Sequence, residues 1–152
     1  MAVSAKAKKP AAFRDKAAFI AFLRKVKTIG LVDPKGGSGT SPPFMKAVED
    51  LGIASEIAPK YRYFQGAGEN VADAIARGEV ETGATAIPEF VPNKGVKVVG
   101  PLPDDVLVFG SVTAAYLGPH AAHPDEARKF LRFLATPAAT KAFRAIGLSP
   151  AS

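Results

Sequence analysis

The sequence predicts an α/β domain built on a largely parallel sheet. Apolar runs of strand length alternate with short amphipathic helical stretches, and this alternation favours parallel strands joined by right-handed crossovers. Hydrophobic residues make up 47% of the 152 residues and charged residues 22%, a composition typical of folded proteins. The length suffices for one domain of ordinary size, but it is too short for two full lobes of about 100 to 150 residues each.

The first predicted unit consists of a strand, a loop and a helix, preceded by another helix at residues 13–26. The apolar positions of that preceding helix recur every three or four residues, with basic residues on its outer side. The apolar run at residues 28–33 is predicted to be a strand that ends at Pro34 and a cluster of glycines. Ser41, followed by two prolines, is typical of a helix N-cap and Gly52 of a helix end, so a helix is expected between them.

The same pattern repeats in the rest of the chain. Further strands are predicted at residues 61–64, 82–87, 96–99 and, as a long extended run, 106–117. Further helices are predicted at residues 70–77, 125–135 and 137–146. In sheets of this kind, ligands bind where strands end and helices begin.

The basic residues are concentrated near the amino terminus. The formal net charge is +6; residues 1–28 contain eight lysines and arginines and one acidic residue, so this segment carries +7 and the remainder −1. We interpret residues 1–11 as a basic, flexible, solvated leader. Because the rest of the chain has no basic stripe interleaved with aromatic residues, no nucleic-acid partner is expected.

The composition excludes several classes of protein. The chain has no cysteine, which excludes disulfides, cysteine-ligated metal sites and thiol nucleophiles. No stretch approaches the roughly 18 apolar residues of a membrane span, so no membrane insertion is expected. Charges recur from Lys6 to Lys27, where a secretory signal would need an apolar core, so we expect a cytoplasmic chain if Met1 is its natural start.

The loop from Asp33 to Ser41 has the composition that most favours ligand binding. Three glycines expose backbone N–H groups, and three hydroxyl side chains lie at a helix start, where the macrodipole favours negative charge. An anion site is one interpretation of this loop. The other is a flexible connection whose serine caps the helix, and the sequence pattern alone leaves both open.

Residues 35–41 also resemble the deviant phosphate loop of partition-type ATPases. Thr40 occupies the position where that loop has its phosphate-binding lysine, so the β- and γ-phosphates would lack their main counter-charge. Nucleotide hydrolysis is therefore not expected.

Other candidate residues offer weaker signals. His120 and His123 lie three apart near acidic residues, but a solvent-facing loop explains them better than a metal site does. No serine lies in a Gly-x-Ser-x-Gly elbow, so hydrolase chemistry lacks support. Glu79, Glu81 and Glu89 are interpreted as surface charges, although Glu89 follows a predicted strand and could face a cleft. No metal, other cofactor or catalytic residue is predicted.

A series of segments shares its order and register with a known protein family. The segments are Ile29-Gly-Leu-Val-Asp-Pro34, Leu51-Gly-Ile53 with Lys60, Asn70-Val-Ala-Asp-Ala-Ile-Ala-Arg-Gly78, Thr82-Gly-Ala-Thr85, Gly95-Val-Lys-Val-Val99, Phe133-Leu-Ala-Thr-Pro-Ala-Ala139 and Ala145-Ile-Gly-Leu148. Together with the Gly/Ser/Thr loop, they resemble the molybdate-binding proteins of ABC importers, which are type 2 periplasmic binding proteins. The resemblance runs from about residue 12 to residue 150.

The resemblance implies a fold of two α/β lobes joined by crossover strands, with an oxyanion held in the cleft by backbone N–H groups and hydroxyls. Only the second lobe and the C-terminal return into the first are matched. Residues 12–105 would then be the substrate-binding lobe, and residues 106–152 a crossover strand and C-terminal helices of the incomplete first lobe. The location that the resemblance implies is the periplasm.

The resemblance also implies which residues bind the ligand. The loop would supply amide and hydroxyl donors, Val71 would supply a backbone amide at the next helix start, and Ala86 stands where molybdate binders present a tyrosine hydroxyl. The full set of implied ligand-binding residues is Gly37, Ser38, Gly39, Thr40, Ser41, Val71 and Ala86. Without the tyrosine hydroxyl, a related anion or a small organic solute is an alternative to molybdate.

We therefore expect a non-enzymatic module that binds a small solute or oxyanion and works with an ABC permease if it is exported. The two C-terminal helices would normally pack on first-lobe elements, so we expect a homo-oligomer, a segment-swapped dimer or a separate first-lobe chain. Two alternatives stay open: a cytoplasmic ligand-sensing or regulatory domain of the same fold, and a truncated remnant without independent binding.

Overall fold

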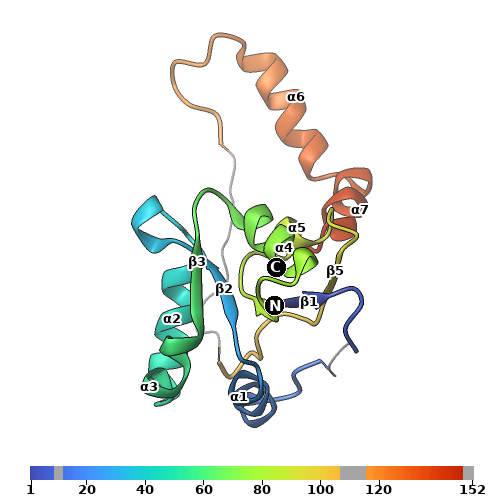
Figure 1. Ribbon diagram of the computed structural model, residues 1–152. Helices are drawn as coiled ribbons and strands as arrows, with labels where there is room; N and C mark the ends of the chain where they lie inside the picture. Colours follow the sequence, from blue (N-terminus) through green and yellow to red (C-terminus); the bar gives the residue numbers. More distant parts are fainter. Residues whose placement is uncertain (9–11, 107–115, 149–152) are drawn as a thin grey trace. The chain divides into compact units, whose positions relative to one another are not determined.

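The structure confirms an α/β architecture in which helices flank a five-stranded sheet (Figure 1). It is a computed structural model that describes residues 1–8, 12–106 and 116–148. Contacts within the chain divide it into two units, Met1–Val108 and Phe109–Ser152. In the described ranges, no helix combines the length and the apolar character needed to cross a membrane.

The sheet belongs to the first unit, and its strands follow the order β3-β2-β4-β1-β5. The strands are β1 (Ala2–Ser4), β2 (Ile29–Val32), β3 (Tyr61–Phe64), β4 (Thr82–Gly83) and β5 (Val96–Val98). Strand β2 runs parallel to β3 and β4, whereas β1 is antiparallel to both β4 and β5. The sheet is therefore mixed: four strands run in one direction, in line with the prediction of a largely parallel sheet, but both pairings of β1 are antiparallel.

The helices lie within a few residues of their predicted bounds. In the first unit they are α1 (Lys16–Lys25), η1 (Pro34–Gly36), α2 (Ser41–Asp50), α3 (Ala54–Ile57), η2 (Ala58–Lys60), α4 (Gly68–Arg77) and α5 (Ile87–Phe90). In the second unit they are α6 (Pro124–Leu134) and α7 (Pro137–Ala145). The short helices α3 and α5 and the turns η1 and η2 were not predicted, because a single turn leaves no apolar periodicity to detect.

The strand predicted at residues 82–87 is wrong in its second half. Strand β4 ends at Gly83, and Ile87 begins α5. Pro88 has no backbone N–H for a sheet ladder, and the Glu89 carboxylate accepts the Ala86 N–H, as a residue in the first turn of a helix does. The long extended run predicted at 106–117 falls mostly on residues 107–115, which lie outside the described residues.

The interpretation of residues 1–11 as a solvated leader is wrong for the first four residues. Ala2 and Val3 are buried, and β1 lies between β4 and β5 in the sheet. The buried hydroxyl of Thr82 also donates to the Ala2 carbonyl oxygen at 2.7 Å. The charge pattern concealed this strand, because the lysines that follow it dominate the composition while the strand itself has three residues.

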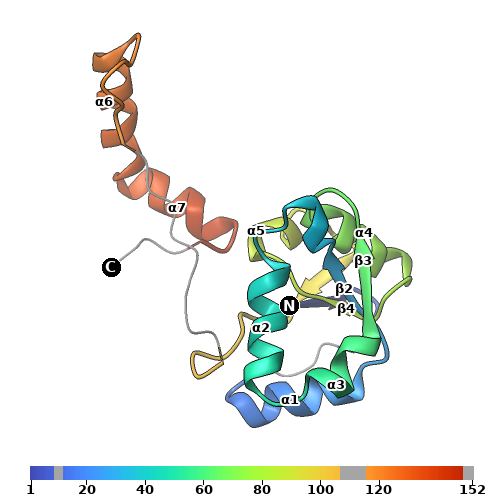
Figure 2. The ribbon, with the colours of Figure 1, turned by 90° about the vertical axis from the view of Figure 1, so that its left-hand side faces the viewer.

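Two apolar clusters pack against opposite faces of the sheet. Leu31 and Val32 are neighbours in β2 whose side chains point to opposite faces, since side chains alternate along a strand. Leu31 joins a cluster with α1, α2 and α3, and Val32 joins one with α4 and α5. Figures 1 and 2 show the two groups of helices on either side of the strands. The first unit therefore has three layers.

Two paired glycines let α4 approach the sheet closely. Gly30 of β2 lies opposite Gly83 of β4, and Val71 of α4 packs over both. A β-carbon at Gly83 would lie 2.5 Å from Val71 Cγ1, and one at Gly30 would lie 3.0 Å from the same atom. Glycine at these positions is required by the separation of helix and sheet.

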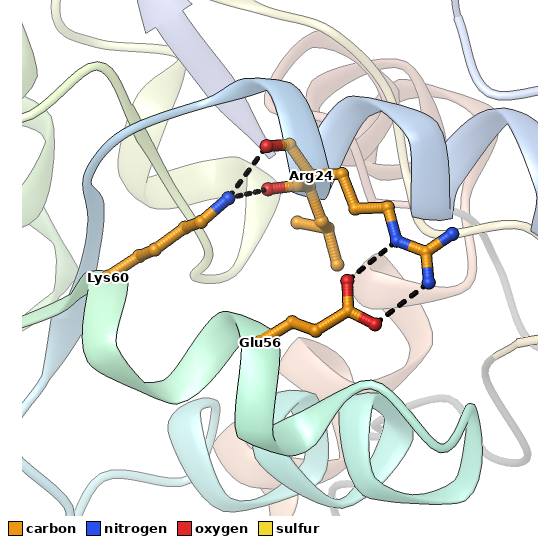
Figure 3. A network of polar contacts seen from close by, with 4 residues as sticks. Arg24, Glu56 and Lys60 are labelled. Atoms are coloured by element: carbon orange, nitrogen blue, oxygen red, sulfur yellow. Dashed lines mark hydrogen bonds and ion pairs between the residues drawn. The ribbon is translucent and has the colours of Figure 1, made fainter.

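The end of α1 is held by two side chains that follow it in the sequence (Figure 3). Lys60 Nζ donates to the carbonyl oxygens of Leu23 and Arg24, at 2.8 Å each. Arg24 also forms a two-pronged ion pair with Glu56, with N–O distances of 2.8 and 2.9 Å, and this contact lowers the pKa of the Glu56 carboxyl. A lysine on terminal carbonyls offsets the partial negative charge of a helix end.

The second unit is a pair of helices with apolar side chains on its surface. Thr136 caps α7, because its hydroxyl accepts the Ala139 N–H at 3.3 Å and donates to the Phe133 carbonyl at 2.7 Å. Phe130 and Phe133 of α6 stack with ring centroids 6.4 Å apart. The large apolar residues exposed in this unit are Tyr116, Phe130, Phe133, Ile146 and Leu148.

Candidate functional site

Three connections meet at the carboxyl edge of the parallel strands. The first joins β2 to α2 through η1, the second joins β3 to α4, and the third joins β4 to α5. Because β2 runs parallel to β3 and β4, all three leave the sheet at one edge, and Figure 2 shows them at the same end of the first unit. This edge is where the sequence predicts a ligand.

Hydroxyl and amide groups of the first connection bond mainly to one another. Ser38 Oγ accepts the N–H groups of Thr40 and Ser41, at 3.3 and 3.1 Å, and so binds the first amide of α2. Ser41 was predicted to be the N-cap, but it is the first helical residue, and its buried hydroxyl donates to the Val32 carbonyl at 2.6 Å. The N-cap of α2 is Thr40, whose side chain makes no capping bond, so the prediction of Ser41 as the N-cap is off by one residue.

Thr40 connects this loop to the third connection. Its Oγ1 lies 3.3 Å from Thr85 Oγ1 and 3.4 Å from Ser38 Oγ. The loop glycines lie beside open space, since a β-carbon at Gly37 or Gly39 would meet no atom within 4 Å. Gly37 has φ 83°, a conformation that favours glycine, and its N–H donates to the Pro34 carbonyl.

Glu89 lies where the second and third connections meet. Its Oε1 accepts the Gly68 N–H at 3.0 Å, and its Oε2 accepts the Ala86 N–H at 3.1 Å together with the Thr85 hydroxyl. A β-carbon at Gly68 would overlap both the Glu89 carboxylate and the Thr85 hydroxyl. The carboxylate therefore lies directly against the backbone at the start of α4.

The structure places the seven residues implied by the resemblance in different surroundings. The loop residues, Gly37 to Ser41, lie together, and Ala86 is close to them because its neighbour Thr85 contacts Thr40. Val71 is fully buried, and its side chain packs against the sheet. The backbone N–H that donates to a charged group at the start of α4 is that of Gly68, three residues before Val71.

Sequence reasoning missed Gly68 and Thr85 and named Glu89 only as a surface charge that could face a cleft. Glu89 does follow Ala86 by three residues, which is the spacing at which a glutamate reaches back to an N-cap amide. That spacing was a usable signal. Nothing local indicates its bond to Gly68, which lies 21 residues earlier.

Each unit has an open hollow in its described part, and neither hollow includes the Gly/Ser/Thr loop. One of about 700 Å³ is lined by residues of α4 and α5 and the segment that follows, among them Asp73, Pro88, Glu89 and Asn93. The other, of about 410 Å³, is formed by α7 and the residues beside it. Within residues 1–8, 12–106 and 116–148, no three His, Asp or Glu side chains gather closely enough to hold a metal ion.

Comparison with known proteins identifies the family. The sequence profile of the family described as bacterial extracellular solute-binding protein matches residues 1–149. The chain belongs to this family of solute-binding proteins. The predicted resemblance to the binding proteins of ABC importers is therefore confirmed at the level of a solute-binding domain.

A solved structure supports the fold of this solute-binding protein. It is the substrate-binding domain of a protein from Clostridium difficile designated a molybdenum ABC transporter, with 15% sequence identity and a TM-score of 0.72. The match covers 99% of this chain and 62% of that one. At this identity the likeness establishes a shared fold.

A curated relative of this solute-binding protein has an enzymatic name. An aconitate isomerase from a Pseudomonas species is 33% identical over 82 residues, which is 54% of this chain and 31% of the isomerase. The chain thus spans less than two thirds of the length of either relative.

Proposed function

We propose that this solute-binding protein binds a small anionic solute at the carboxyl edge of β2, β3 and β4. The observation that carries the proposal is that this edge already holds a carboxylate, that of Glu89, on two backbone amides and one hydroxyl. In the described parts of the chain, no hydrogen bond or ion pair brings a lysine or arginine side chain to this group. Neutral donors of this kind select an anion by shape and hydrogen-bond geometry.

The nature of the solute is suggested by the names of two relatives. One is named for molybdenum, which occurs in oxygenated water as the oxyanion molybdate. The other is named for aconitate, a tricarboxylate. An oxyanion such as molybdate is our first candidate. Ala86 lacks the hydroxyl that molybdate binders present, but the Thr85 hydroxyl lies next to it and offers a replacement.

Ligand-induced stabilisation tests this proposal. We would measure the melting temperature with molybdate, tungstate, sulfate and phosphate, since a ligand at about 100 times its Kd adds roughly 2.7 kcal/mol to the free energy of unfolding. T40V should reduce the shift, because it removes a hydroxyl at the edge. T140V, in α7, is the matched control and should leave the shift unchanged. No shift with any of these anions would overturn the proposal.

We further propose that the domain binds its solute without converting it and delivers it to an ABC permease outside the cytoplasm, as the family description suggests. Isomerisation is the competing function, favoured by the 33% identity to the aconitate isomerase over 82 residues. Incubation with trans-aconitate, followed by proton NMR, separates the two. Formation of the cis isomer above the rate in buffer would replace the transport proposal with an enzymatic one.

The assembly proposal rests on the exposed apolar residues of the second unit. Phe130 and Phe133 are 59% and 52% exposed, and burying such a side chain fully is worth about 1.5 to 3 kcal/mol. We propose that two copies pair or exchange α6 and α7, or that a separate first-lobe chain covers them. Light scattering after gel filtration tests this, and a folded protein that elutes at monomer mass would contradict it.

A further inference from the structure

We propose that Glu89 controls the access of anions to this site by acting as a resident anion. Its carboxylate occupies the donors at the starts of α4 and α5, and an external anion gains those donors only after the carboxylate has left. The inference rests on the proposed function, because it concerns how the same site admits a solute.

The donors around Glu89 match those that an oxyanion would use. They are the N–H of Gly68, which begins the ten-residue helix α4, the N–H of Ala86, and the hydroxyl of Thr85. Each is a neutral donor, and together they engage both carboxylate oxygens. The four groups in contact are the Glu89 carboxylate and its three donors, and only the carboxylate is charged.

The Glu89 carboxylate fits against the backbone because Gly68 has no side chain. A methyl group there would overlap the Glu89 carboxylate and the Thr85 hydroxyl. An oxygen atom can therefore approach the backbone at the start of α4 at this position, and the oxygens that do so belong to Glu89. Glu89 is half-buried, so solvent reaches part of it.

While the Glu89 carboxylate is in place, the Thr85 hydroxyl cannot donate a hydrogen bond to any other group. A hydroxyl carries one proton. Thr85 donates its proton to Glu89, so in the contact between Thr40 and Thr85 the donor must be Thr40. An anion that approached Thr85 would meet the lone pairs of its oxygen and not its proton.

The hydroxyl protons of Ser38 and Ser41 are also donated to acceptors within the chain. Ser38 donates its hydroxyl proton to Ser41 Oγ at 3.1 Å, and Ser41 donates its own to the Val32 carbonyl. Departure of Glu89 would release three donors at once: the Thr85 hydroxyl and the N–H groups of Gly68 and Ala86. The position of one side chain therefore decides whether this edge repels or attracts an anion.

The carboxylate has space to move into. Glu89 lines the open hollow of about 700 Å³ formed by α4, α5 and the segment after α5. A change of side-chain rotamer would carry the carboxylate from the donors toward this hollow and into water, where a charge is well solvated.

The experiment compares wild type, E89A and E69Q by isothermal titration with sodium molybdate, sodium sulfate and sodium phosphate at one ionic strength. If Glu89 holds the donors about nine-tenths of the time, its removal should tighten binding by about tenfold, because the competent fraction rises toward one. E69Q is the matched control. It removes a negative charge from the first turn of α4 without touching the donors and should change the affinity less than twofold.

A second readout follows the donors themselves. The backbone amide resonances of Gly68 and Ala86 should shift when molybdate is added to wild type, together with the side-chain carboxyl carbon of Glu89. In E89A the two amides should respond at about tenfold lower molybdate concentration. If E89A does not fold, E89Q keeps the side-chain volume and serves in its place, with a smaller gain expected because its amide oxygen still accepts one N–H.

Each outcome decides a different statement. Equal affinities for wild type and E89A, or weaker binding by E89A, would overturn the role of Glu89 while leaving anion binding intact. A gain of similar size in E69Q would also overturn it, since general charge repulsion would then explain the effect. Absence of binding by wild type and E89A to all three anions would overturn the proposed function and this inference with it.

Discussion

Gly68 and Glu89 contact each other closely enough that a change in one should affect the other. Gly68 offers an N–H with no β-carbon beside it, and the Glu89 carboxylate fills the space that a β-carbon would need. Glycine in a helix interior costs about 1 kcal/mol relative to alanine, and alanine is also the better helix former at the first position, which Gly68 occupies in α4. Here the glycine allows a charged hydrogen bond that alanine would obstruct, so the usual preference should reverse.

We expect G68A to lower the free energy of unfolding by about 1 to 3 kcal/mol, the usual range for overpacking. The methyl group would push the carboxylate away from its amide donors. The double variant G68A/E89A should be more stable than the sum of the single effects predicts, with a coupling of about 0.5 to 3 kcal/mol measured by urea unfolding. G118A, where a β-carbon would meet open space, is the control. Strictly additive effects would show that the two residues do not interact.

Ser41 carries a second residue-scale prediction. Its fully buried hydroxyl donates to the Val32 carbonyl at 2.6 Å. S41A would leave that carbonyl without this partner, and we expect a loss of about 1 to 3 kcal/mol in the free energy of unfolding. S55A, at an exposed position of α3, should change it by less than about 0.5 kcal/mol. A loss in S41A no larger than in S55A would mean that the bond contributes nothing to stability.

Helix α1 is held at its end by residues that come more than 30 positions later. Lys60 caps the carbonyls of Leu23 and Arg24, while Glu56 pairs with the Arg24 side chain. The ion pair is exposed, so solvent screens it and it adds little. The Lys60 contacts replace missing helical hydrogen bonds and should matter more.

We expect K60M to lower the free energy of unfolding by about 1 to 2 kcal/mol, because two carbonyl groups lose charged donors while the apolar stem is kept. K27M, which changes an exposed lysine beside the same helix end, should have less than about half that effect. Guanidinium unfolding followed by circular dichroism provides the comparison. If the two variants proved equally stable, the cap would have no energetic role.

The two units of the molecule differ in how they bury apolar residues. Both apolar clusters of the core consist of residues of the first unit, up to Val106. The second unit has one buried hydrophobic residue in its described part, Ala139, and exposes several large ones. Stability and association should therefore reside in different units.

We expect a chain that ends at residue 108 to unfold cooperatively, with a melting temperature within about 4 to 8 °C of the full chain, the shift that 1 kcal/mol produces in a domain of this size. A chain that ends at residue 98 is the matched control. It lacks the buried residues Val99 and Val106 and should be clearly less stable. Thermal scanning of both proteins provides the test, and an unfolded 1–108 chain would show that the second unit supports the first.

The sequence by itself determined the order and kind of most elements. Strand β3 has the predicted bounds, and α2 begins within one residue of its predicted start, because local periodicity, proline and glycine act over a few neighbouring residues. The segments quoted for the resemblance were also enough to identify the family. The binding roles of all seven implied residues stay predictions: Gly37, Ser38, Gly39, Thr40, Ser41, Val71 and Ala86.

Only the tertiary structure decided where distant residues meet. It placed Ala2 beside Thr82, 80 positions away, Thr40 beside Thr85, 45 positions away, and the Glu89 carboxylate on the Gly68 amide. No local pattern encodes such pairs, because their contacts exist only once the sheet has brought three strand ends to one edge. The composition of the Gly/Ser/Thr loop predicts an anion site. In the folded chain, Thr85 lies between this loop and the Glu89 carboxylate, which already occupies donors at the same edge of the sheet.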